Sequence, residues 1–227
     1  DVTLGDVYAE LGHGLVLSVR KRDELASDDT VRGGRASGKV DLGDVRIVAP
    51  EGFGTVFAAP CLVRVQAEHP GITVELVTST SPLSLRGSGF DIAVTVGSAT
   101  SSRLTAEALA PYALRLYASR DYLAAHPPIV SLSDLERHPL VFYVDALLTV
   151  RELDLAPVLN GMHVGFGSTN VFAQLEATRS GAGIGLLHAF MAESDPRLAP
   201  VLPDEVDFRL MFSLSVRKDS LGVDAVR

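Results

Sequence analysis

A strand, a helix and a second strand are predicted within residues 44–77, which read DVRIVAPEGFGTVFAAPCLVRVQAEHPGITVELV. Val45 to Ala49 and Ile72 to Val77 are short runs rich in β-branched residues, whereas apolar residues from Val56 to Glu68 recur with helical spacing. Pro60 falls inside that helix, so its first turn should be irregular or the helix should begin later. Strands joined by a crossover helix pair in parallel, and the stretch therefore predicts an α/β fold.

The alternation of strands and helices continues to the end of the chain. Further strands are predicted at 91–96, 113–118, 140–143, 162–166, 184–187 and 208–216, and further helices at 120–125, 147–156 and 171–180. These segments form two α/β units joined by extended strands. We therefore expect a bilobal molecule with a cleft between the units.

Residues 1–40 differ from the rest of the chain. Apolar side chains recur there at spacings of three or four, at Leu4, Tyr8, Leu11, Leu15 and Val19. This pattern predicts an amphipathic helix, although Gly12 and Gly14 each disfavour a helix by about 1 kcal/mol. The glycine-rich stretch 28–38 is typical of a flexible linker, which places a boundary near residue 40. Alternatively, residues 1–27 are the first helix of the globular domain.

The composition is that of an ordinary globular protein, with 47% hydrophobic and 21% charged residues. A formal charge of -8 would be repelled by a phosphate backbone, so these residues are not expected to bind nucleic acid directly. Apolar runs are shorter than the about 18 residues of a membrane span, so no membrane contact is expected. Cys61 is the single cysteine, which excludes an intrachain disulfide and favours the cytoplasm.

Motifs for catalysis, metals and cofactors are not found. Gly181, Gly183 and Gly185 resemble a dinucleotide fingerprint, but here the helix precedes the glycines and the strand follows them, the reverse of the required order. The six histidines have no metal-ligand spacing, and the nucleophile elbow of hydrolases is missing. We therefore expect no catalytic residues, no metal and no cofactor.

Two polar corners are candidate ligand sites. Gly52 and Gly54 lie between a predicted strand and helix, and residues 168–170, Ser-Thr-Asn, precede the helix predicted from Val171. Such residues are by default helix caps, but the carboxyl ends of strands are also where open α/β sheets hold ligands. Two helix N-termini facing one cleft would suit a carboxylate.

Seven segments in this order resemble the sensing domain of LysR-type transcriptional regulators, over nearly the whole chain from Gly38 onward. They are GKVDLGDVRIVAP (38–50), HPGITVEL (69–76), FDIAVTVG (90–97), LRLYASRDYLAAHP (114–127), LSDLERHPL (132–140), GAGIGLLHAF (181–190) and LAPVLP (198–203). The resemblance implies a type 2 periplasmic-binding-protein-like fold, with two Rossmann-like lobes joined by two hinge strands. It assigns residues 1–40 to a linker helix and flexible linker, 41–227 to the effector-binding domain, about 43–112 plus 219–227 to lobe I, about 119–212 to lobe II, and 113–118 and 213–218 to the hinges.

The resemblance also implies an effector held between the lobes. The matching positions are Glu51, Gly52, Thr55, Thr95, Gly97, Tyr143, Asp145, Ser168 and Thr169. Thr55 is the only hydroxyl in the first segment, where Glu51 and Phe53 occupy places that are often small or polar. This departure argues against a plain carboxylate effector and favours one that also carries a positive or hydrogen-donating group. His188 stands where the family often has proline.

The function implied is regulatory. The partners would be a small-molecule effector, a second copy of the chain in a homodimer or homotetramer, and DNA only through a winged-helix domain absent from these residues. The chief alternative is a secreted solute-binding protein of the same fold class, whose mark would be an N-terminal signal or lipid-anchor cysteine. An enzyme is the third alternative, disfavoured because the chain has no coherent catalytic set.

Overall fold

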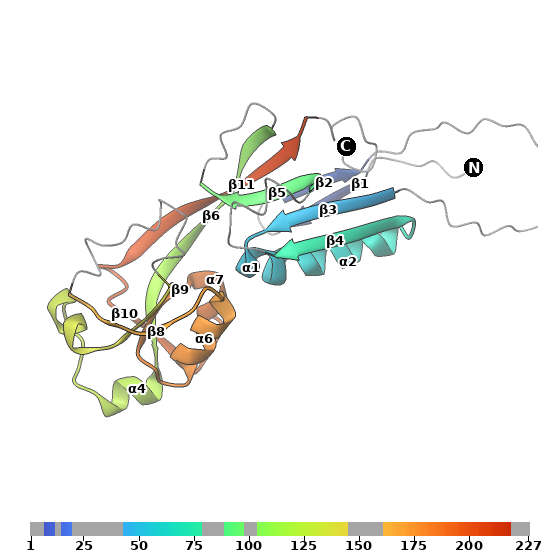
Figure 1. Ribbon diagram of the computed structural model, residues 1–227. Coiled ribbons are helices and arrows are strands. Elements are labelled where there is room, and N and C mark those ends of the chain that lie inside the picture. The colour runs from blue at the N-terminus through green and yellow to red at the C-terminus, as the bar shows by residue number, and fades with distance from the viewer. Residues whose placement is uncertain are drawn as a thin grey trace, which may run out of the picture.

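The computed structural model describes residues 7–11, 15–19, 43–78, 89–97, 104–144 and 161–218. Within them the chain forms two α/β lobes that share one nine-stranded sheet (Figure 1). Helices cover the sheet in both lobes, and two long strands run from one lobe to the other. The predicted bilobal α/β architecture is confirmed.

Lobe I is built on three parallel strands, β3 (Gly43–Ala49), β4 (Ile72–Thr78) and β5 (Ile92–Val96), with β3 in the middle. The helical segment between β3 and β4 consists of α1 (Glu51–Phe53), a π-helical turn (Gly54–Ala58) and α2 (Ala59–Glu68). Val45, Ile47 and Leu62 are among the buried side chains that join strands and helix in one core. The crossover predicted from the sequence is therefore present.

This helical segment begins at Glu51 and not at Val56, where the sequence pattern begins. Pro60 has no N–H to donate within the helix, and the turn just before it widens to π spacing, with the N–H of Ala59 bonded to the carbonyl of Gly54. A side chain at Gly54 would place its Cβ 2.6 Å from a Thr78 methyl carbon. The glycine therefore serves close packing of the helix on β4, although its presence suggested a loop.

Lobe II is also built on three parallel strands, β8 (Val164–Gly167), β7 (Leu140–Phe142) and β9 (Ile184–His188). Its other elements are α4 (Arg120–Ala125), a 3-10 helix (Leu132–Arg137), α6 (Val171–Arg179), α7 (Ala189–Ala192) and the edge strand β10 (Leu198–Val201). Helix α4 has the predicted bounds and α6 nearly so. The sequence pattern did not predict the 3-10 helix, α7 or β10, which are short.

The lobes are connected by two antiparallel strands, β6 (Leu104–Ser119) and β11 (Asp207–Arg217). The predicted hinge segments 113–118 and 213–218 fall largely within them. The sheet order is β4-β3-β5-β11-β6-β9-β7-β8, with β10 paired to β6, so one hydrogen-bonded ladder spans both lobes. Pro111 pairs with Met211 in this ladder, and the register shifts between Phe212 and Ser213.

An antiparallel hairpin, β1 (Val7–Leu11) with β2 (Leu15–Val19), replaces the amphipathic helix predicted for residues 1–27. That prediction is wrong in these residues. Gly12 and Gly14 disfavour a helix and suit a short hairpin connection, while the valines of both strands favour β structure. The boundary near residue 40 stays a prediction. The helix predicted at 147–156 and segment 219–227 lie outside the described residues.

A buried ion-pair network stabilises lobe II. Asp195 is 8% exposed, and its Oδ2 lies 2.5 Å from Nε of Arg179 and 3.0 Å from Nη2 of Arg197. Hydrogen bonds from Arg197, and secondarily the charge of Arg179, hold the pKa of the Asp195 carboxyl well below its ordinary value. The network therefore ties the C-terminal end of α6 to the loop that precedes β10.

Candidate functional site

A carboxylate from lobe I closes the N-terminus of α6 in lobe II. One oxygen of Glu51 accepts a hydrogen bond from Nδ2 of Asn170 at 2.5 Å, and the other accepts from the backbone N–H of Val171 at 3.2 Å. Figure 1 shows why this contact forms, since α1 lies at the end of lobe I that faces α6 and α7. We call the group of Glu51, Asn170 and the Val171 N–H the interlobe clasp.

The electrostatics of the clasp are favourable. The first N–H groups of a helix have no partner within the helix and carry the positive end of its dipole, which attracts a carboxylate. Asn170 is the N-cap of α6, and its Oδ1 accepts from the N–H of Ala173 at 2.7 Å. At a partly exposed position each such interaction contributes about 0.3 to 1 kcal/mol. The clasp is therefore a modest but directional link between the lobes.

Tyr143 lies at the end of β7, near the clasp, and its ring packs against both hydrophobic clusters of lobe II. Burial raises the pKa of its hydroxyl well above the ordinary range, and the negative charge of Glu51 adds to that shift. Tyr143 therefore keeps its proton at neutral pH. It can donate a hydrogen bond to a ligand in the cleft.

Aromatic rings from both lobes and both hinge strands meet below the clasp. They are Phe53 and Phe57 of lobe I, Phe190 of α7, Tyr112 of β6 and Phe212 of β11, and we call them the aromatic cluster. Phe57 and Phe190 approach to 4.9 Å between ring centroids, and Tyr112 stacks on Phe212 at 4.0 Å. Such pairs stabilise by about 0.5 to 1.5 kcal/mol beyond area burial. The lobes thus touch through apolar as well as polar groups.

His188 adds a sixth ring at the edge of this cluster. It stacks on Tyr112 with centroids 5.5 Å apart and lies 5.2 Å from the ring of Phe190. Burial among these rings lowers the pKa of its imidazole to about 4. His188 is therefore neutral at pH 7, and its position between the end of β9 and the start of α7 makes it part of the interlobe junction.

The predicted hydroxyl residues have different surroundings. The Oγ1 of Thr95 is buried and has no hydrogen-bond partner among the described residues. The Oγ of Ser168 accepts from the N–H of Asn170 at 3.1 Å. Thr55 and Thr169 are exposed. Only Thr95 therefore has a hydroxyl that needs a partner.

The structure brings together some of the predicted site residues and not others. Glu51, Gly52, Tyr143 and Ser168 lie at the junction of α1 with α6, where a Cβ on Gly52 would meet Sδ of Met191 at 3.3 Å. Thr95 and Gly97 lie instead on or just after β5, where Gly97 has a positive φ of 73° and donates its N–H to the Met211 carbonyl. Asp145 lies outside the described residues.

Several residues at the junction were not predicted as part of the site. Asn170 was recognised only as a possible cap, and its bond to Glu51 joins positions 119 residues apart. Four further members of the junction had no local sequence signal at all, namely Phe57, Tyr112, Phe190 and Phe212. Their proximity arises from the way the lobes meet.

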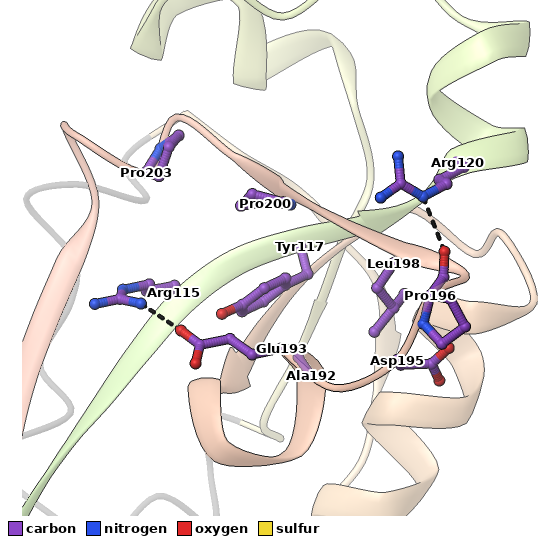
Figure 2. A pocket seen from close by; sticks show the side chains of 10 residues that line it. All are labelled: Arg115, Tyr117, Arg120, Ala192, Glu193, Asp195, Pro196, Leu198, Pro200 and Pro203. Carbon is purple, nitrogen blue, oxygen red and sulfur yellow. Dashed lines mark hydrogen bonds and ion pairs between the residues drawn. The ribbon is translucent and has the colours of Figure 1, made fainter.

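A separate cavity of about 350 Å³ lies on lobe II between β6, β10 and the loop after α7. Figure 2 shows Tyr117 between two arginines, with Arg115 paired to Glu193 and Arg120 bonded to the Pro196 carbonyl. The predicted effector-binding residues do not line it. Its charged groups are already largely paired with one another.

Two further searches concern the described residues alone. None of their helices is long and apolar enough to cross a membrane. In the same part of the chain, no group of three histidine, cysteine, aspartate or glutamate side chains is placed to hold a metal ion.

Two α/β lobes sharing a sheet through paired hinge strands define the type 2 periplasmic-binding-protein-like class. The family model for the LysR substrate binding domain matches residues 39–227. The chain belongs to this family, and the resemblance noted in the sequence is confirmed.

The relatives agree with this assignment. An uncharacterized HTH-type transcriptional regulator of Haemophilus influenzae is 29% identical over 105 residues, which cover 46% of this chain and 36% of the relative. This chain therefore matches about a third of the length of that curated relative.

Solved structures share the fold. The regulatory domain of CrgA, a LysR-type transcriptional regulator from Neisseria meningitidis, has a TM-score of 0.69 and 24% identity, covering 79% of this chain and 91% of that one. Full-length AphB of Vibrio cholerae has a TM-score of 0.69 and 22% identity, covering 82% of this chain and 66% of that one. At these identities the likeness establishes the fold.

Proposed function

We propose that this chain is the sensing domain of a LysR-type transcriptional regulator and binds a small polar effector between its two lobes. The observation that carries the proposal is the junction itself, where polar groups from both lobes meet above an aromatic floor. Effector binding would change how the lobes and subunits pack, and through them the spacing of DNA-binding domains. Family membership favours this role over capture by a secreted solute-binding protein.

The proposed effector-binding residues remain those predicted from the sequence, including Asp145 and Thr169. Thr95 has the best physical support, because a buried hydroxyl without a partner costs about 1 to 3 kcal/mol. A polar group of the effector would satisfy it. Tyr143 supplies a protonated hydroxyl on the lobe II side.

The remaining parts of the proposal follow from the family. DNA would be contacted by a helix-turn-helix domain outside this chain, and the charge of -8 is consistent with that division of labour. The domain would act without catalysis, in the cytoplasm, as a homodimer or homotetramer, since isologous interfaces are the commonest way that copies of a chain associate.

Thr95→Val tests the site with a side chain of nearly the same shape. Its unliganded free energy of unfolding should equal or exceed that of the wild type, because the unpartnered hydroxyl is gone. Its affinity for the effector should fall by about 0.5 to 1.5 kcal/mol, the usual net contribution of one hydrogen bond. Calorimetry with a panel of amino acids, amines and aromatic or aliphatic acids would identify the effector and measure the loss.

The matched control is Thr73→Val, an exposed threonine of β4. An effector bound equally by wild type and Thr95→Val would refute the role of Thr95. The regulatory role itself is tested by footprinting with the full-length gene product. Operator contacts unchanged by a confirmed effector would contradict it.

A further inference from the structure

The interlobe clasp already places a carboxylate where a ligand carboxylate would be held at the N-terminus of α6. We propose that Glu51 is a tethered anion that fills this position, so that the cleft excludes effectors presenting a carboxylate there and takes a group that is neutral or cationic at this end. The proposal rests on the proposed function for the identity of the site. It adds the charge class of the ligand.

The donors that hold Glu51 are fixed independently of it. The Oδ1 of Asn170 is committed to the N–H of Ala173, which leaves the Nδ2 donor directed at lobe I. The preceding turn is held by Ser168, whose Oγ accepts from the Asn170 N–H and whose carbonyl accepts from Gln174 at 2.7 Å. Gln174 is 1% exposed. The two donors would therefore stay in place as an anion site if Glu51 were removed.

The space at the clasp is too small for a second carboxylate. A Cβ on Gly52 would meet Sδ of Met191 at 3.3 Å and a Val171 methyl carbon at 3.6 Å, so the backbone of lobe I already touches lobe II. A ligand carboxylate on the same donors would lie within about 4 Å of the charge of Glu51. Like charges at that distance disfavour binding.

A simpler role for Glu51 would be that of a helix cap. That role is already filled, because Asn170 occupies the N-cap of α6 and accepts a hydrogen bond there. A capping role predicts lower stability for Glu51→Ala and no new affinity for anions. A tethered anion predicts that removing the side chain creates an anion site.

The experiment measures acetate and benzoate binding to wild type and Glu51→Ala by calorimetry and by the amide NMR signal of Val171. The wild type should show no saturable shift at that amide. Glu51→Ala should bind both anions with a gain of about tenfold or more, since a charge-assisted hydrogen bond is worth at least that factor. The matched control Glu68→Ala removes an exposed carboxylate from the same helical segment and should behave as the wild type.

A second substitution localises the gain. Asn170→Ser retains an oxygen that caps α6 but loses the amide donor, so adding it to Glu51→Ala should reverse the gained affinity. Should Glu51→Ala not fold, Glu51→Gln keeps the size and removes the charge, and anion binding should appear in it as well. Equal acetate responses in wild type and the variants would overturn the proposal.

The result can be separated from the proposed function. Acetate and benzoate are the probes, so a failed search for the natural effector would count against the proposed function and leave the clasp result standing. Conversely, benzoate that binds wild-type protein at the Val171 amide would overturn the tethered anion and leave the sensing role intact.

Discussion

Replacing Phe57 and Phe190 by alanine, singly and together, measures how strongly the aromatic cluster holds the lobes to each other. Phe57 belongs to the π-helical turn of lobe I and Phe190 to α7 of lobe II. Their centroids lie 4.9 Å apart with an interplanar angle of 54°, within the about 4.5 to 7 Å range of favourable ring pairs. The contact therefore links the two lobes directly.

The magnitude follows from burial. A fully buried phenylalanine replaced by alanine costs about 3 to 5 kcal/mol, and because both rings here are only partly buried we expect about 2 kcal/mol for each. Phe190 should cost more than Phe57, since it also contacts His188 at 5.2 Å and Tyr112 at 6.2 Å. The coupling between the two substitutions should be about 0.5 to 1.5 kcal/mol.

The assay is urea unfolding followed by circular dichroism on the wild type, both single variants and the double variant. The control cycle pairs Phe57 with Phe172, a partly buried ring of α6 that packs within lobe II. Distant substitutions add within about 0.3 to 0.5 kcal/mol, so the control coupling should be near zero. A Phe57–Phe190 coupling no larger than the control would refute the view that these rings hold the lobes together.

Two further expectations concern pH. Asp195→Asn should lower the free energy of unfolding by about 1 kcal/mol or more at pH 7. Because the pKa of Asp195 in the folded chain lies below its ordinary 3.8, its stabilisation is present above that value and is lost as pH falls below it, so variant and wild type should converge in acid unfolding series. For His188, whose folded pKa is about 4 instead of 6.5, the unfolded chain binds the proton first, and wild-type stability should decline as pH falls from 6.5 to 4. His188→Phe should flatten this decline in the same measurement, and slopes equal to that of the exposed control His163→Asn would contradict the assignment.

Local periodicity was enough to predict the elements whose packing is simple. The strands β3 and β4 and helix α4 were predicted within a residue or two, because β-branched runs and helical spacing reflect one buried face. The N-terminal hairpin was missed because the spacing of its apolar residues also fits a helix, and the glycines between the strands were given too little weight. The early start of the helix at Glu51 depends on packing against β4, which no local pattern reveals.

The candidate site was predictable only in part, for a related reason. Glu51 and Ser168 stand at strand-to-helix junctions, which the sequence can identify. That Glu51 would be bound to the protein itself depends on the distance between lobes. Rings such as Phe190 and Phe212 come from segments with no shared pattern, so their meeting could not be predicted before the fold was known.

The irregular pairing of β6 with β11 indicates where the molecule can bend. Pro111 has no N–H for the ladder, and Leu109 is the extra residue opposite the register shift between Phe212 and Ser213, which makes this site a β-bulge. Because the rest of the two strands is continuously paired, we expect rotation between the lobes to be concentrated as a change of twist at this bulge. Both connections would then move as a single ribbon, with Tyr112 and Phe212 stacked beside the axis of that motion.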